Sequence, residues 1–191
     1  RIWPLDPLVR GNALVSSTSY FLLGKVLTLL INASKSFRSK SKQGLYGDVI
    51  QEIDANVGRI LKKLDQLKLD KNTLIIFSSD NGPWLNFGNH AGSSGGFREG
   101  KGTSFEGGHR VPCIMRWRGV IPAGKVANQL SSTIDILPTL ADITQTKLPS
   151  HKIDGVNLYP LIKGDLSLTP RTTFYYYYRK NSLEEIGRAH V

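Results

Sequence analysis

Two adjacent oxygen-bearing side chains, Asp80 and Asn81, stand directly after the apolar run at residues 74–77, and the turn residues Gly82 and Pro83 follow them. One carboxylate oxygen and one amide oxygen suit a hard cation such as Ca²⁺ or Mg²⁺ better than a soft metal. An ordinary Asx turn would use the same two residues, so their spacing alone leaves both interpretations open.

A second candidate for chemistry is the glycine-rich loop at residues 100–108, in which Lys101 stands between Gly100 and Gly102. Glycines allow the backbone to approach a ligand closely, and an ammonium group there could stabilise an anionic ester and the charge that develops on it during reaction. The upstream spacing of a Walker A loop is not met. A flexible surface loop is the alternative interpretation.

Two helices are predicted around these loops. Residues 133–140 read as the entry to one, with Asp135 as its N-cap and Pro138 in its first turn. Apolar residues at spacings of three and four predict the other, a helix of about twenty residues with one apolar face. Its apolar residues are Val49, Ile53, Val57, Ile60, Leu61, Leu64 and Leu67.

Strands are predicted where apolar residues run continuously. Residues 74–77 are rich in β-branched side chains, which predicts a strand buried on both faces of a largely parallel sheet, and a second apolar run covers residues 111–115. Helix, strand, long loop, strand and helix in this order indicate an open α/β sheet. Ligands of such sheets bind beyond the carboxyl ends of the strands, where Asp80 and Asn81 fall.

The basic charge of the chain is concentrated near its two ends. The formal net charge is +10, but residues 1–44 hold seven Lys and Arg against Asp6 alone, and residues 166–191 hold four against two acidic residues. Residues 45–165 therefore carry a net charge of only +2. A nearly neutral middle argues against a surface that binds the phosphates of nucleic acid.

Cys113 is the only cysteine, which excludes an internal disulfide and a thiolate metal cluster. Because it lies in the apolar run at residues 111–115, we expect a buried, inert thiol rather than a nucleophile.

No membrane span is expected from the sequence. The longest apolar stretch, residues 20–31, is interrupted by Gly24 and Lys25. It is shorter than the ~20 residues that cross a bilayer, and it lacks the ordered features of a signal peptide.

Several motifs follow one another in a characteristic order between residues 42 and 112. These motifs are Lys42-Gln43-Gly44, Ser78-Ser79-Asp80-Asn81-Gly82-Pro83-Trp84, Gly88-Asn89-His90-Ala91-Gly92, Arg98-Glu99-Gly100-Lys101-Gly102-Thr103, Phe105-Glu106-Gly107-Gly108 and Arg110-Val111-Pro112. From about residue 34 to about residue 183 the chain thus resembles the C-terminal part of arylsulfatases, members of the sulfatase family. The resemblance implies an α/β fold, namely part of the alkaline-phosphatase-like open mixed sheet flanked by helices, with the start of a small C-terminal α+β subdomain.

The resemblance also implies roles for individual residues. Asp80 and Asn81 match the family's ligands of an active-site Ca²⁺, and Lys101 matches the catalytic lysine that contacts the substrate sulfate. His90 would face the same pocket, either as a substrate contact or as a neutral structural histidine. Glu106 would hold the loop rather than take part in the chemistry.

Family sulfatases hydrolyse sulfate esters of aryl groups or carbohydrates, and their nucleophile is a formylglycine made from a Cys/Ser-x-Pro/Ala-x-Arg motif. None of the 191 residues matches that motif. We therefore expect the nucleophile in a missing N-terminal segment, and we expect this fragment alone to be inactive. Sulfated small molecules or glycans are the expected substrates, and family members are lysosomal, periplasmic or secreted.

The resemblance divides the chain into four segments. Residues 1–33 match poorly and are predicted to be mistranslated, residues 34–150 are the C-terminal half of the catalytic domain, and residues 151–184 begin the C-terminal subdomain. Residues 185–191 read like a translated sequencing adapter, which we interpret as an artefact. His109 departs from the family, which usually has an aliphatic residue there.

Other functions stay open at this point. A phosphoesterase of the same fold is one alternative, although such enzymes usually bind two transition metals through Asp and His clusters. A non-catalytic module with structural calcium is the other alternative. The tyrosines at residues 175–178 are predicted to pack along a strand, with a stacking platform for sugar or nucleic acid as the competing interpretation.

Overall fold

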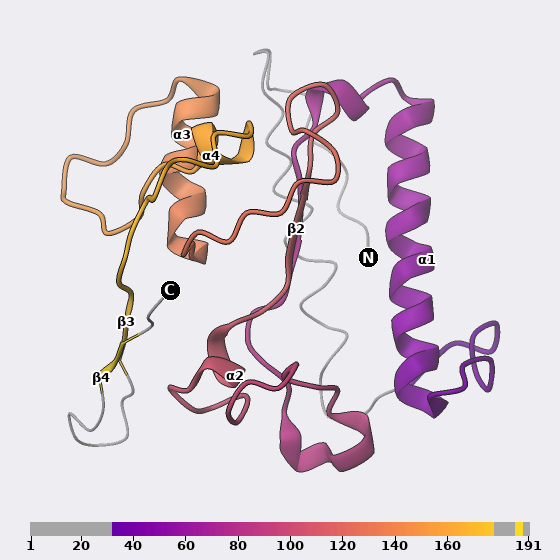
Figure 1. Cartoon of the computed structure of the whole chain (residues 1–191). Coiled ribbons are helices and arrows are strands. Elements are labelled where there is room, and N and C mark those ends of the chain that lie inside the picture. The colour runs from indigo at the N-terminus through magenta and orange to yellow at the C-terminus, as the bar shows by residue number, and fades with distance from the viewer. Residues whose placement is uncertain (1–31, 178–185, 189–191) are drawn as a thin grey trace.

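The computed structural model of the protein describes residues 32–177 and 186–188. Figure 1 shows the β1–β2 pair between the long helix α1 on one side and the helices α3 and α4 on the other. The elements are α1 (Gly44–Gln66), η2 (Asp70–Asn72), β1 (Ile75–Ser78), η3 (Leu85–His90), α2 (Glu106–His109), β2 (Cys113–Arg116), η4 (Thr133–Asp135), α3 (Ile136–Thr144), α4 (Tyr159–Ile162), β3 (Tyr175–Tyr177) and β4 (Ile186–Arg188).

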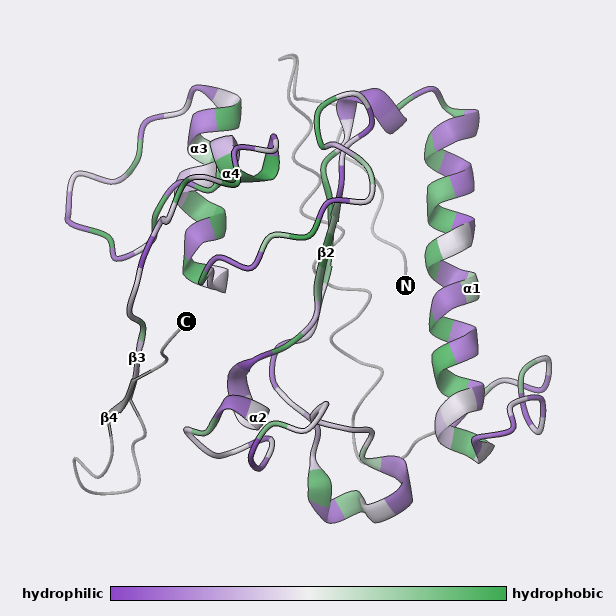
Figure 2. Ribbon diagram, viewed as in Figure 1, coloured by the Kyte–Doolittle hydropathy of each residue, from purple (hydrophilic) through white to green (hydrophobic). Residues whose placement is uncertain are grey.

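Helix α1 confirms the predicted helix and extends it to 23 residues. Apolar residues recur along its length in Figure 2. Val49 is buried near its N-terminal end, whereas Ile60 and Leu67 are 45% and 53% exposed. Periodicity therefore predicted the helix correctly, but only part of the apolar face is covered by the described residues.

The N-terminal end of α1 is fastened by Asp48. Its carboxylate accepts hydrogen bonds from the backbone N–H groups of Ser39 (2.7 Å), Lys40 (2.9 Å) and Ser41 (2.7 Å), and the side chain is almost completely buried. These N–H donors, Ser41 first, outweigh the effect of burial and lower the pKa of Asp48. The turn at residues 35–39 is thus tied to the helix.

The two central strands are antiparallel, with Ile75 opposite Arg116 and Ser78 opposite Cys113. The predicted parallel strand buried on both faces is wrong for the described residues, since β1 is only half-buried along its length. A continuous apolar run indicates apolar neighbours on both faces but carries no information about strand direction. The direction follows from the loop at 79–112, which returns the chain beside β1.

Apolar side chains of the strands meet α3 and α4 on one face. Leu158 and Leu161 are buried there, each 4% exposed. A shallow apolar hollow lies at this contact and is lined by Leu74, Ile76, Met115, Ile136, Thr139, Leu140, Leu158 and Ile162. The alternation of Leu74 and Ile76 toward this face is the period of two expected for a strand.

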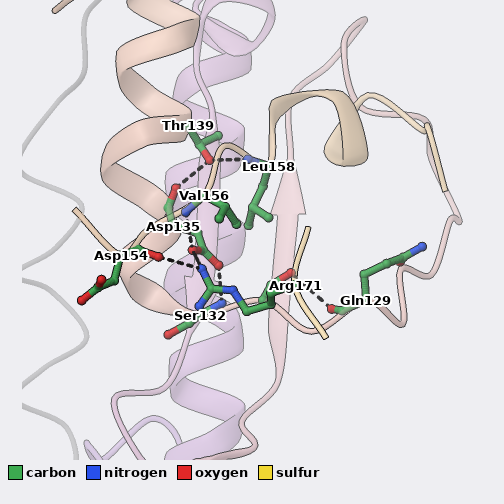
Figure 3. A network of polar contacts seen from close by, with 9 residues as sticks. Gln129, Ser132, Asp135, Thr139, Asp154, Val156, Leu158 and Arg171 are labelled. Carbon is green, nitrogen blue, oxygen red and sulfur yellow. Dashed lines mark hydrogen bonds and ion pairs between the residues drawn. The ribbon is translucent and has the colours of Figure 1, made fainter. Parts of the chain in front are cut away.

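Asp135 directly precedes α3, as predicted, but its side chain caps no N–H group of that helix. The carboxylate instead accepts hydrogen bonds from the backbone of Ser132 (2.7 Å) and Val156 (2.9 Å), and it forms an ion pair with Arg171 (Figure 3). Asp135 is fully buried. Asp135 thus occupies the predicted N-cap position of α3, but its carboxylate is bound by Ser132, Val156 and Arg171 instead of by an N–H group of the helix.

Thr139 adds a second polar link at the same place. Its hydroxyl donates to the carbonyl of Asp135 (2.6 Å) and accepts the N–H of Leu158 (2.8 Å), as Figure 3 shows. Together, Asp135, Thr139 and Arg171 form what we call the Asp135 clamp. The clamp fastens the segment 154–171 onto the start of α3.

Cys113 corrects another prediction, because the residue is exposed rather than buried. It stands at the start of β2, and its strand partner is Ser78. Partial burial of the thiol raises its pKa, although a hydrogen bond with Ser78 acts in the opposite direction. A raised pKa favours the protonated thiol, which is the less reactive form.

Three residues of the tyrosine run, Tyr175–Tyr177, form β3, which pairs antiparallel with β4. Strand β4 lies within residues 185–191, the segment that we interpreted as an artefact. The predicted mistranslated segment falls outside the described residues except for residues 32–33, and the apolar stretch 20–31 falls outside completely. No helix in the described part of the chain has both the length and the apolar character needed to cross a bilayer.

Candidate active site

The candidate residues lie on two loops that are joined backbone to backbone beyond the end of β1. The N–H of Gly82 donates to the carbonyl of Gly108 (2.9 Å), and the N–H of Lys101 donates to the carbonyl of Pro83 (2.8 Å). The loop with Asp80 and the loop with Lys101 are therefore held in one layer, which we call the glycine layer. The motifs that were predicted to share one site thus lie on adjacent loops.

Three glycines of this layer have no room for a side chain. A Cβ atom on Gly82 would lie 1.7 Å from the carbonyl oxygen of Gly107, and one on Gly107 would lie 2.0 Å from that of Glu99. A Cβ atom on Gly108 would lie 2.6 Å from the carbonyl oxygen of Thr103. These contacts are far below van der Waals separation, so close backbone packing explains the glycines of the motif.

Asp80 and Asn81 keep free oxygen atoms. Asp80 is exposed, and its carboxylate makes no hydrogen bond or ion pair with the residues that the structure describes. The side-chain NH₂ of Asn81 donates to the carbonyl of Gly82 (2.8 Å), which orients the amide and leaves its Oδ1 atom without a partner there. One carboxylate and one oriented amide oxygen suit the hard cation predicted from the sequence.

These two side chains would supply only some of the ligands that a calcium ion needs. Ca²⁺ takes about 6–8 oxygen ligands. The described residues contain no group of three or more His, Cys, Asp or Glu that could hold a metal ion. The donor chemistry of Asp80 and Asn81 fits a hard cation, and a full Ca²⁺ coordination shell would need oxygen ligands besides these two side chains.

Lys101 presents its charge toward solvent at the edge of the same layer. The residue is exposed, and its ammonium makes no ion pair within the described ranges. The Nζ atom lies 5.4 Å from the centroid of the Trp84 ring. The hydroxyl of Thr103 donates to the carbonyl of Gly100 (2.9 Å), which stabilises the turn around Lys101. The positive charge is available for an anion.

His90 ends η3, and its imidazole is exposed. In the described part of the chain it forms no hydrogen bond with Asp80, Asn81 or Lys101. The segment after it runs close to α1: a Cβ atom on Gly92 would lie 2.5 Å from the hydroxyl oxygen of Tyr46 in that helix. The role of His90 in substrate binding stays a prediction.

Glu106 occupies a structural position, as the sequence indicated. It begins α2, and its carboxylate forms an ion pair with Arg110 at 3.2 Å. Arg110 in turn lies over the ring of Phe97, 4.9 Å from its centroid. This arrangement holds the two ends of the loop at residues 97–110 together.

Two aromatic residues border the layer: Tyr176, from the tyrosine run that was predicted to pack along a strand, and Trp84, to which sequence reasoning gave no separate role. Tyr176 of β3 stacks on His109 of α2, with ring centroids 3.9 Å apart and an angle of 24° between the planes. Burial raises the pKa of Tyr176, and the nearby charge of Glu106 adds to this shift. Trp84 follows Pro83 directly, and its place beside the Asp80-Asn81 motif was the signal that could have singled it out.

Comparisons with known proteins agree on one family. The sequence model of the Sulfatase family matches residues 29–146. N-acetylgalactosamine-6-sulfatase of Canis lupus familiaris is 45% identical over 148 residues, which cover 76% of this chain and 28% of that protein. Steryl-sulfatase of Homo sapiens is 40% identical over 151 residues, which cover 76% of this chain and 26% of that protein. The chain thus spans about a quarter of the length of these relatives.

Solved structures of sulfatases also resemble this chain. The PsFucS1 sulfatase from Pseudoalteromonas sp. superposes with a TM-score of 0.65 at 36% identity, over 69% of this chain and 27% of that chain. A structure from work on glycosaminoglycan metabolism by Bacteroides thetaiotaomicron superposes with a TM-score of 0.73 at 30% identity, over 86% of this chain and 35% of that chain. The chain therefore belongs to the sulfatase family, with the α/β fold that the resemblance implied.

Proposed function

We propose that this chain is part of an enzyme that hydrolyses sulfate esters of aryl groups or carbohydrates. The observation that carries the proposal is the glycine layer, which joins the Asp80-Asn81 loop to the Lys101 loop through two backbone hydrogen bonds. The side chains of Asp80 and Lys101 make no hydrogen bond or ion pair within the described residues, so both charges can bind ligands. Membership in the sulfatase family supports the same assignment.

Asp80 and Asn81 would hold a Ca²⁺ ion through the carboxylate and the amide Oδ1 atom. When bound, the ion would stabilise negative charge on the oxygens of the sulfate group. The nucleophile would be the family's formylglycine, supplied from outside this chain.

Lys101 would bind the sulfate group of the substrate. Its ammonium would attract the anionic ester and stabilise the charge that increases on the sulfate oxygens and the leaving oxygen during reaction. The Gly82–Gly108 and Lys101–Pro83 hydrogen bonds fix the backbone that carries both groups, so the ligands need not be ordered anew in each catalytic cycle. His90 would add a further contact to the substrate.

The proposal can be tested on the ¹⁵N-labelled 191-residue chain by NMR titration, which detects weak binding to a partial site. We expect Ca²⁺ to shift the amide signals of residues 79–82, and inorganic sulfate to shift those of residues 100–103. Asp80→Asn should remove the response to Ca²⁺ alone, and Lys101→Met should remove the response to sulfate alone.

A matched control is Asp165→Asn, which changes a carboxylate outside the glycine layer and should leave both responses intact. Shifts of the same size at the Asp65 and Asp70 region as at residues 79–82 would show that Ca²⁺ binds carboxylates without selectivity. That result would contradict the proposed calcium site.

A further inference from the structure

We infer that Trp84 forms a ring-binding subsite beside Lys101, so that the site favours sulfate esters carried on a six-membered ring over esters of small alkyl groups. This inference rests on the proposed function, and it adds a specificity-determining residue to the proposed sulfate site. Aromatic rings and sugar rings both present a flat or nearly flat face, of π or apolar C–H surface, that can stack on an indole.

The indole lies next to the place that the ring of a bound ester would occupy. Trp84 follows Pro83, whose carbonyl accepts the N–H of Lys101 at 2.8 Å, so the backbones of Trp84 and Lys101 are adjacent. The Lys101 Nζ atom is 5.4 Å from the Trp84 ring centroid. A sulfate group held by Lys101 would therefore bring the group that it esterifies next to the indole.

Trp84 is also braced and still accessible. The ring of Phe87 packs against it edge to face, with centroids 4.7 Å apart and an angle of 82° between the planes. The N–H of Phe87 donates to the carbonyl of Trp84 at 3.0 Å. The residue nevertheless remains 37% exposed. A rigid, part-exposed indole loses little conformational freedom when a ring stacks on it.

A competing role for the same residue is to position Lys101. An indole face attracts an ammonium group at this distance, so Trp84 could act only by holding the lysine. The two roles differ in what they do to an ester that has no ring. A positioning residue affects every sulfate ester alike, whereas a ring subsite affects only the esters that carry a ring.

The test compares phenyl sulfate, glucose 6-sulfate and methyl sulfate in NMR titrations of the 191-residue chain. We expect both ring esters to bind about tenfold more tightly than methyl sulfate, as one aromatic contact commonly provides. Trp84→Ala should reduce their affinity to that of methyl sulfate and leave methyl sulfate itself unchanged. Trp84→Phe should retain most of the preference for phenyl sulfate.

Phe97→Ala is the matched control, because Phe97 is 38% exposed on the same loop but has Arg110 rather than Lys101 as its cationic neighbour. It should keep the preference for rings. If only one of the two ring esters binds more tightly than methyl sulfate, the subsite stands and its ring class is identified.

Two outcomes would overturn the inference. Equal weakening of all three esters by Trp84→Ala would leave Trp84 as a positioning residue, and equal affinity of the three esters for the unchanged chain would exclude a ring subsite. Failure of the proposed function has a different signature. In that case sulfate would produce no shift at residues 100–103, while a neutral ring such as methyl glucoside or benzyl alcohol would still shift the Trp84 indole signal and support the subsite.

Discussion

Two aspartates of this chain have opposite surroundings. Asp135 is fully buried and is bound by two backbone N–H groups and by Arg171, whose side chain is only 10% exposed. Asp80 is exposed and has no partner among the described residues. An aspartate thus contributes to packing in the Asp135 clamp, whereas another aspartate, Asp80 in the glycine layer, remains free for a ligand.

The difference shows why residue type alone does not identify a functional site. A buried carboxylate must be fully hydrogen-bonded, so Asp135 has no capacity left for a ligand. Asp80 instead lies on a loop whose glycines allow close backbone packing, and its oxygens make no hydrogen bond with the described residues. Substitutions should therefore affect stability in the Asp135 clamp and ligand binding in the glycine layer.

The largest effect on stability is expected from Asp135→Asn. The change keeps the size of the side chain but leaves the buried Arg171 charge without a counterion, which should cost about 3–5 kcal/mol of unfolding free energy. Urea unfolding followed by circular dichroism would measure the loss. Hydrogen exchange at the Ser132 and Val156 amides should also accelerate, since both donate to this carboxylate.

Asp80→Asn is the paired control for that experiment. It should change the unfolding free energy by less than about 0.5 kcal/mol, as is usual for an exposed site. Equal destabilisation by the two substitutions would remove the contrast between the clamp and the glycine layer.

Lys101→Ala should have the next largest effect, and the effect should be on catalysis. In the intact protein that carries this chain, loss of one charge-stabilising group should lower kcat for 4-nitrophenyl sulfate by about 10²–10³-fold. The unfolding free energy should stay nearly constant, because the ammonium makes no ion pair among the described residues. Lys163→Ala, a lysine outside the layer, should retain full activity.

Gly82→Ala tests whether the layer depends on close backbone contact. The added Cβ atom would meet the carbonyl oxygen of Gly107 at 1.7 Å, so the two loops must move apart. We expect a loss of about 1–3 kcal/mol in unfolding free energy, together with weaker calcium and sulfate responses. Thermal unfolding and the NMR titrations would measure the two effects.

Gly58→Ala provides the opposite control, because nothing lies within 4 Å of a Cβ atom at Gly58 in α1. Alanine there should stabilise the chain by about 0.5–1 kcal/mol. A loss of stability similar to that of Gly82→Ala would show that added methyl groups, rather than the contact with Gly107, are responsible.

The smallest effect is expected from Asp48, and it should depend on pH. Its pKa in the folded chain is lowered from the usual 3.8 by the N–H donors of the turn, chiefly Ser41. The stabilisation is therefore present above about pH 4 and disappears as the pH falls through the lowered pKa. The difference in melting temperature between the unchanged chain and Asp48→Asn should shrink between pH 6 and pH 2. A difference that is constant over this range would contradict the assignment.

Much of the candidate site could be predicted from the sequence because its motifs are local. Asp80, Asn81 and Lys101 lie on short segments with a characteristic order of residues, and family resemblance assigned them together. The structure places their loops in one layer, whereas His90 forms no hydrogen bond with Asp80, Asn81 or Lys101 in the described part of the chain. The roles of all four in binding and catalysis remain to be tested by the experiments above.

Helix α1 and the loop glycines were determined by the sequence itself. Helical periodicity and the absence of a Cβ atom act through neighbours a few residues apart or through the backbone of one residue, so their effect can be seen in the sequence alone. Only the tertiary structure decided the antiparallel pairing of β1 with β2, the exposure of Cys113 and the burial of Asp135. Each of these depends on a partner far along the chain, such as Arg171, 36 residues from Asp135, and long-range contacts are chosen by the free energy of the whole packed fold.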